Sequence, residues 1–182
     1  MQLLQNTRRK LGEYFLKKEL ANSHRNSIFQ NFEKSATIGI LFNATNQEDF
    51  ELVKKYVNYL KGLNKKVKAL GYFSKREMPE LTYSKFEFDF FTKKDLNWHL
   101  KPDKDFIDNF INEEFDILLV LDLKDDFPLR YISALSKAKF KMGNLTADTE
   151  IYDMMIEVEE GKGIKYFLKH LDHYLMQLNK NF

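Results

Sequence analysis

The sequence has no cysteine, one tryptophan, three prolines and seven glycines in 182 residues. Without cysteine, a disulfide framework, a thiolate zinc site, an iron–sulfur cluster and a cysteine nucleophile are all excluded. The glycines form neither Gly-x-Gly-x-x-Gly nor a P-loop ending in Gly-Lys-Ser/Thr, the two patterns that let backbone amides approach phosphates. The Gly-x-Ser-x-Gly pattern of many serine hydrolases is absent too. We therefore expect no bound cofactor.

A strong net charge and long apolar runs are also missing. The chain carries 29 Lys and Arg against 27 Asp and Glu, a formal net charge of +2, which does not favour nucleic acid as a partner. Its longest apolar runs, such as residues 117–121, are far shorter than the ~20 residues needed to span a bilayer, and no signal-peptide pattern follows the first basic residues. We expect a soluble, cytoplasmic protein without integral membrane association.

The composition is that of one globular domain. Hydrophobic residues make up 43% and charged residues 31% of the chain, and the length suits a single domain over residues 1–182. Residues 1–34 hold seven Lys and Arg against three Glu, a net charge of +4. Residues 2 to about 22 have apolar side chains at helical spacings, and we expect this basic amphipathic helix and its connector to pack on the domain.

Six segments have the apolar composition of strands, and most are separated by helices. The strands are expected at residues 36–42, 67–73, 86–91, 117–121, 140–142 and 152–158. The helices after the N-terminal one are expected at residues 47–60, 102–111, 128 to about 139 and 164–178. This alternation predicts an α/β fold, a three-layer Rossmann-like sandwich with a mostly parallel sheet. Residues 86–91 alternate apolar with acidic side chains, which places that strand near an edge of the sheet.

Particular residues mark the ends of these helices. Asn46 is suited to the N-cap of the second helix, and Gly62 and Asn64 offer the left-handed backbone positions that end it. Pro102 and Pro128 each suit a first helical position, because proline lacks the amide hydrogen that is unpaired there.

Residues 92–101 show no readable periodicity and are assigned no structure. They contain Trp98, flanked by Asn97 and His99. We expect the tryptophan to be buried over the edge of the core, as this residue usually is. An aromatic binding wall or an interface anchor is the alternative.

Two loops are candidates for a ligand site. In an open parallel sheet, ligands bind beyond the carboxyl ends of the strands, where residues 43–46 and 122–127 are expected to lie. We predict a ligand-binding crevice formed by Asn43, Thr45, Asp122 and Lys124. Asp122 ends a buried strand, so its carboxylate must face the crevice or a hydrogen-bond donor.

Metal binding is not expected. Asp122, Asp125 and Asp126 have the oxygen ligands that Mg²⁺ requires, but Asp125 and Asp126 also precede a helix, where acidic residues complement the helix dipole. His170 and His173 share one helical face, yet the sequence has only two other histidines to complete a zinc site.

One segment resembles a known enzyme family. A strand bounded by Phe115-Asp116 and Asp122 is followed by a helix and by the Ala-Lys-x-x-x-Gly turn at residues 138–143. This segment resembles part of the N-terminal half of heptosyltransferase-like glycosyltransferases, whose second Rossmann-like half holds the sugar nucleotide and has no counterpart here. Over its whole length, the chain also looks like a small uncharacterised bacterial protein family with no assigned activity.

Three hypotheses follow. The first is a non-enzymatic α/β domain that binds a partner protein or a small-molecule ligand in the predicted crevice. The alternative is a degenerate or partner-dependent glycosyltransferase-like enzyme acting on a sugar or nucleotide, with Asp122 as a base. The third is an accessory protein that binds a membrane or nucleic acid through the basic N-terminal helix, using Arg8, Arg9, Lys10, Lys17 and Lys18. The sequence does not indicate an oligomeric state.

Overall fold

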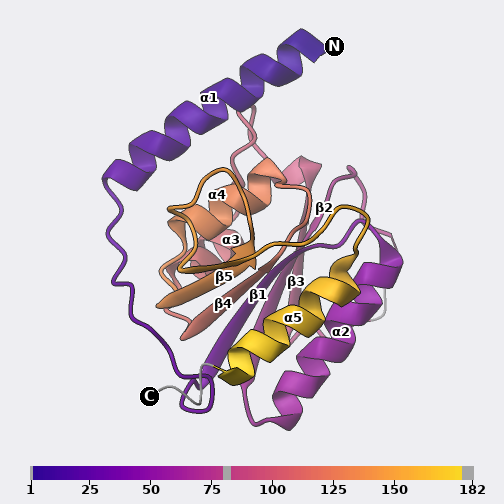
Figure 1. The fold of residues 1–182 in the computed structure, drawn as a ribbon. Helices are drawn as coiled ribbons and strands as arrows, with labels where there is room; N and C mark the ends of the chain where they lie inside the picture. Colours follow the sequence, from indigo (N-terminus) through magenta and orange to yellow (C-terminus); the bar gives the residue numbers. More distant parts are fainter. Residues whose placement is uncertain (1, 80–82, 178–182) are drawn as a thin grey trace.

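A parallel sheet flanked by helices forms the centre of the computed structural model, which describes residues 2–79 and 83–177 (Figure 1). Its six strands are β1 Thr37–Asn43, β2 Lys66–Phe73, β3 Phe88–Thr92, β4 Ile117–Leu121, β5 Phe140–Asn144 and β6 Met154–Ile156. The helices are α1 Gln2–Ala21, α2 Gln47–Gly62, α3 Asp105–Asn112, α4 Phe127–Leu135 and α5 Ile164–Gln177, with a 3-10 turn, η1, at Lys93–Asp95. The predicted α/β class and the order of elements are confirmed.

The strand order is β3-β2-β1-β4-β5-β6, and each pair of neighbouring strands is parallel. The chain builds the sheet outward from β1 to β3 and then returns to place β4 on the other side of β1. In a doubly wound sheet, this reversal between β1 and β4 is the switch point where ligands bind. The prediction that residues 86–91 form an edge strand is confirmed by the position of β3.

Both faces of the sheet are covered, which explains the continuous apolar composition of its central strands. Along β1, the side chains of Ile38, Ile40 and Phe42 belong to one core cluster with α2 and α5. Leu41 belongs to the opposite cluster, with α3 and α4. Each of these four side chains is fully buried, and burying one such side chain contributes about 1.5–3 kcal/mol.

The start of α2 agrees with the prediction, but its end differs. The Oδ1 atom of Asn46 accepts hydrogen bonds from the amides of Glu48 and Asp49, at 2.8 and 3.3 Å, so Asn46 is the N-cap. At the other end, Asn64 has the left-handed conformation, with φ of 61°. Gly62 does not, because it is still the last helical residue; the prediction for that glycine was wrong.

The two prolines predicted to begin helices, Pro102 and Pro128, differ in their positions. Pro128 lies in the first turn of α4, as predicted. Pro102 does not begin α3, which starts at Asp105; instead it forms an isolated antiparallel bridge with Leu96. The bridge closes a loop over residues 96–102, so the proline ends a loop rather than opening a helix.

Other boundaries shift by a few residues. Helix α4 ends at Leu135 rather than near residue 139, because Ser136 has an extended ψ of 137° that turns the chain toward β5. Strand β3 begins at Phe88, and Phe86 is 96% exposed. The predicted end of the last helix, at residue 178, lies outside the described residues.

Trp98 is 54% exposed, so the prediction that it is buried was wrong. The loop is ordered by its neighbour Asn97, whose Oδ1 atom accepts hydrogen bonds from the amides of His99 and Lys101, at 3.1 and 3.0 Å. What Trp98 contributes is its backbone carbonyl, which accepts a hydrogen bond from the Nε atom of Arg8.

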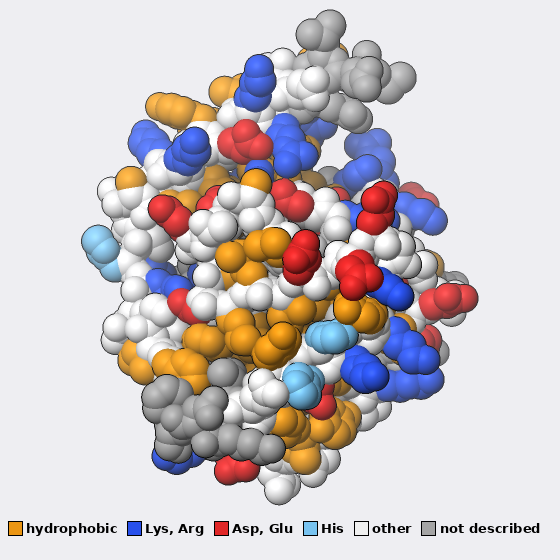
Figure 2. Space-filling model, viewed as in Figure 1, with side chains coloured by type: hydrophobic (Ala, Val, Ile, Leu, Met, Phe, Trp, Pro, Cys, Tyr) orange, Lys and Arg blue, Asp and Glu red, His pale blue; other side chains and the backbone are white. Residues whose placement is uncertain are grey.

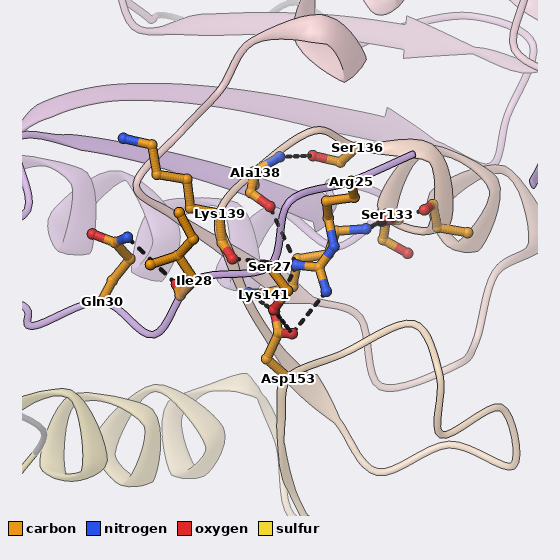
Figure 3. Close-up of polar contacts among 11 residues, drawn as sticks. Arg25, Ser27, Ile28, Gln30, Ser133, Ser136, Ala138, Lys139, Lys141 and Asp153 are labelled. Atoms are coloured by element: carbon orange, nitrogen blue, oxygen red, sulfur yellow. Dashed lines mark hydrogen bonds and ion pairs between the residues drawn. The ribbon is translucent and has the colours of Figure 1, made fainter. Parts of the chain in front are cut away.

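A connector, residues 22–36, leads from α1 to β1 along the edge of the molecule (Figure 1). Figure 3 shows how it is fixed: the guanidinium of Arg25 donates two hydrogen bonds to the carboxylate of Asp153, at 2.6 and 2.7 Å. Burial opposes ionisation of Asp153, but hydrogen bonds from Arg25, Ser27 and the amide of Lys141 outweigh it and lower the pKa of that carboxyl. The connector is thus anchored to residues that flank β6 and begin β5.

Lys141 is buried beside this anchor and is 2% exposed. Its ammonium donates hydrogen bonds to the carbonyls of Ser133 and Ala134, at 2.6 and 3.1 Å, near the end of α4 (Figure 3). Burial lowers the pKa of Lys141 to about 7, and the charge of Arg25 acts in the same direction. The lysine satisfies carbonyls that the end of a helix leaves unpaired.

Helix α1 packs on α4 through a narrow stripe. Leu16 is buried with Phe127, Tyr131 and Leu135, whereas Leu4 and Tyr14 are 63% and 62% exposed. Closest approach occurs at Gly12, where a Cβ atom would lie 2.5 Å from the carbonyl oxygen of His99. Through this stripe, Leu16 of α1 packs against α4.

Replacing Gly12 by alanine tests this approach. Gly12→Ala should lower the free energy of unfolding by about 1–3 kcal/mol, because the added methyl group overlaps a backbone oxygen and the ring of Phe127. Gly62→Ala is the matched control: a Cβ there meets nothing within 4 Å, and alanine should stabilise by about 0.4–1 kcal/mol. Urea unfolding of both variants measures the difference. Equal stabilisation by both substitutions would contradict the packing of α1.

Candidate functional site

The four predicted side chains come together at the carboxyl edge of the sheet. Asn43 is the last residue of β1 and Asp122 follows β4, the strand paired with β1. With Thr45 and Lys124, they line a cavity of about 350 Å³ that also contacts the beginnings of α2 and α5. We call this the Asp122 cavity. It lies at the switch point between β1 and β4.

The carboxylate of Asp122 holds the loop that follows β4. Its two oxygens accept hydrogen bonds from the amides of Lys124 and Asp126, at 3.0 and 2.7 Å. The residue is 7% exposed, and burial raises its pKa to about 6 despite these two hydrogen bonds. Asp122 thus organises the loop with the donors that a buried carboxylate requires.

Asn43 joins the two central loops. Its Oδ1 atom accepts a hydrogen bond from the amide of Thr45 at 2.9 Å, and its amide group donates one to Asp126. The hydroxyl of Thr45 accepts from the amide of Ser74 at 2.9 Å, which ties in the loop after β2. These hydrogen bonds link the loops that follow β1, β2 and β4 at the carboxyl edge of the sheet.

Two charged groups remain for a ligand in the Asp122 cavity. Asp49, from the first turn of α2, and Lys124 both line it. Within residues 2–79 and 83–177, neither the carboxylate of Asp49 nor the ammonium of Lys124 has a hydrogen bond or an ion pair. Burial raises the pKa of Asp49, while the charge of Lys124 acts in the opposite direction.

The described residues contain no group of three or more His, Asp or Glu side chains able to hold a metal ion. The carboxylates of Asp122, Asp125 and Asp126 each have a different partner. The carboxylate of Asp122 binds amides, Asp125 lies 3.4 Å from Arg130, and Asp126 accepts from Asn43.

A second cavity, of about 670 Å³, lies on the other side of the bond between Asn43 and Asp126, beneath α1. Its polar lining includes Arg8, Tyr72, Arg76 and Lys93, which sequence reasoning did not bring together. They come from α1, β2 and the segments after β2 and β3. Only the docking of α1 across the sheet edge unites them, and no local pattern in the sequence encodes that docking.

The strand order and the cavities at the carboxyl edge define the class: a doubly wound α/β protein with space for a ligand at its switch point. The chain belongs to a family of unknown function, DUF6913, whose model matches residues 8–178. Comparison with curated proteins and with solved structures gives no match. None of the helices in the described part of the chain has the length and apolarity to cross a membrane.

The buried carboxyl of Asp122 predicts a pH dependence. Its pKa is about 6 in the folded protein and near 3.9 in an unfolded chain, so between these pH values the folded state binds more protons. The contribution of Asp122 to the free energy of unfolding should therefore fall by about 2–3 kcal/mol as the pH rises from about 4 to about 6.

Urea unfolding across this pH range measures the contribution. Asp122→Asn removes the titration, so the stability of the wild type relative to this variant should decrease with rising pH. Asp103→Asn, at an exposed position, should keep the wild-type slope. An unchanged slope in Asp122→Asn would show that this carboxyl does not titrate differently on folding.

Proposed function

We propose that the protein is a non-enzymatic, cytoplasmic domain, formed by residues 1–182, that binds a small polar molecule in the Asp122 cavity. The observation that carries the proposal is the convergence of Asn43, Thr45, Asp122 and Lys124 on one cavity at the switch point. A volume of about 350 Å³ is within the range of small-molecule sites. This concave shape favours a small ligand over a partner protein.

The charges favour a ligand that carries both signs. Asp49 and Lys124 offer an acceptor and a donor of opposite charge, while Val53, Leu123 and Ile164 supply apolar contacts. A zwitterion with a short apolar part, such as an amino acid, pairs with both charges. In this proposal Asp122 and Asn43 keep the cavity in shape through their hydrogen bonds to the loops.

No observation favours the transferase alternative. Asp122 is 7% exposed, and its two oxygens accept the backbone hydrogen bonds that hold the loop after β4, a structural role that accounts for the residue without a proton transfer. We therefore assign Asp122 to the architecture of a binding site.

Filling the cavity tests the proposal. Gly163 lines the Asp122 cavity, and a Cβ atom there meets nothing within 4 Å, so Gly163→Leu should occupy the cavity without a clash. Saturation-transfer NMR of the full chain with the common amino acids should detect binding in the wild type and its loss in Gly163→Leu. Gly62→Leu is the matched control, because the space at that glycine is also open and it does not line the cavity.

Circular dichroism should show the wild-type spectrum for both variants, as the check that they are folded. Lys124→Gln and Asp49→Asn should each weaken the same ligand by about tenfold, the loss expected for one charge-assisted hydrogen bond. Binding that persists in Gly163→Leu, or that disappears equally in Gly62→Leu, would contradict the location. The proposed ligand class is wrong if no amino acid binds to the wild type.

A further inference from the structure

The larger cavity forms a separate site, which we call the α1 cavity. It is enclosed by α1, by the ends of β2 and β3, and by the first turn of α4. None of the residues that line it lines the Asp122 cavity. A ligand in one cavity therefore contacts a different set of side chains from a ligand in the other.

Cationic side chains dominate the α1 cavity. Arg8 and Arg9 come from α1, Arg76 from the loop after β2 and Lys93 from the 3-10 turn after β3. The guanidinium of Arg9 forms an ion pair with the carboxylate of Glu13, at 3.2 Å. In the described part of the chain, the side chains of Arg76 and Lys93 have no ion pair. Figure 2 shows Lys and Arg side chains gathered along α1 and beside it.

One carboxylate, Asp126, also lines the cavity. It accepts a hydrogen bond from Asn43 and is the N-cap of α4. Arg9 lies within ion-pair distance of Glu13 and of Asp125, so the cations that face this one anion are Arg8, Arg76 and Lys93. The lining is therefore positive, and the positive end of the α4 dipole adds to it. Like charges held together repel one another, and a bound anion removes that repulsion.

The hydroxyl of Tyr72 is a second, independent feature that points to a ligand. Tyr72 lines the cavity and is 3% exposed. Among the residues that the structure describes, its hydroxyl has no hydrogen-bond partner, so it is free to bond to a molecule in the cavity. Burial and the charge of Asp126 raise the pKa of Tyr72 to about 12, so the hydroxyl remains a donor.

An apolar wall completes the site. Leu96, Leu100 and Phe127 line the same cavity. Leu100 has a left-handed φ of 67°, a conformation that costs a non-glycine residue of order 1–3 kcal/mol and is found most often at ligand sites. The loop is held in this shape by Asn97 and contacts α1 through the bond from Arg8 to the carbonyl of Trp98.

We propose that the α1 cavity binds an organic phosphate, a phosphate ester with an apolar or aromatic group. Arg8, Arg76 and Lys93 bind the phosphate dianion, and Tyr72 donates a hydrogen bond to it. The organic group contacts Leu100 and Phe127. The cavity volume of about 670 Å³ far exceeds the volume of a bare phosphate ion. The remaining space, beside the apolar wall, accommodates the organic group.

The dianion distinguishes phosphate from carboxylate. Several convergent cations favour a doubly charged group, and the arginine fork matches two phosphate oxygens at once. A monocarboxylate has half the charge and engages fewer donors. The attraction should weaken with salt, because Arg76 and Lys93 are exposed and the Debye length falls to about 3 Å at 1 M.

Isothermal titration calorimetry of the full chain tests the proposal with four probes: phenyl phosphate, inorganic phosphate, benzoate and benzyl alcohol. Phenyl phosphate should bind most tightly, inorganic phosphate and benzoate more weakly, and benzyl alcohol not at all. Lys93→Gln should weaken phenyl phosphate by about tenfold, and Tyr72→Phe by roughly fivefold. Added salt should weaken it further.

Matched controls separate the site from general charge and from the Asp122 cavity. Lys94→Gln changes the adjacent lysine, and Tyr14→Phe an exposed tyrosine of α1; neither residue lines the α1 cavity, so both variants should bind phenyl phosphate like the wild type. Gly163→Leu, which fills the Asp122 cavity, should also leave this binding unchanged.

Three outcomes would overturn the proposal. One is the absence of saturable phenyl phosphate binding to the wild type. Another is benzoate or benzyl alcohol binding as tightly as phenyl phosphate. The last is an equal loss of affinity in Lys93→Gln and Lys94→Gln. Loss of amino-acid binding in Gly163→Leu is a separate result, which concerns the Asp122 cavity alone.

Discussion

The rest of the structure depends on the pairing of β1 with β4, two strands that are buried on both faces. Polar groups just beyond such strands cannot rely on water, so each must find a partner. Asp122 and Asn43 supply those partners by binding the amides of their own loops. The hydrogen bonds of Asp122 hold the loop that leads to α4. The Asp122 cavity is thus a consequence of how a buried parallel pair ends.

Sequence reasoning succeeded where one local constraint decides the structure. The apolar runs of β1 and β4, the cap at Asn46 and the proline in the first turn of α4 all act within a few residues. It failed where a distant contact decides. Pro102 pairs with Leu96, and Trp98 is exposed, with its carbonyl bound to Arg8 of α1. Neither partner is evident from the local sequence pattern.

The candidate sites divide in the same way. Asn43, Thr45, Asp122 and Lys124 were predictable because every parallel strand ends at a known edge of the sheet, and two neighbouring strands bring their loops together. The α1 cavity was not predictable. Its residues are separated by up to about 120 positions, and the helix that covers it is positioned by a glycine, Gly12, whose role is the absence of a side chain.

The charges of α1 distinguish Arg8, which is open to a ligand, from Arg9, which is paired with Glu13. Glu13 lies 3.0 Å from Arg130, and Glu19 lies 2.8 Å from Lys101. Burial opposes ionisation of both glutamates, but Arg9 and Arg130 lower the pKa of Glu13, and Lys101 lowers the pKa of Glu19. The acidic groups of α1 are therefore largely engaged in holding the helix on the domain. In the part of the chain that the structure describes, Arg8 forms no ion pair, so the contacts that dock α1 leave a positive charge beside the proposed phosphate site.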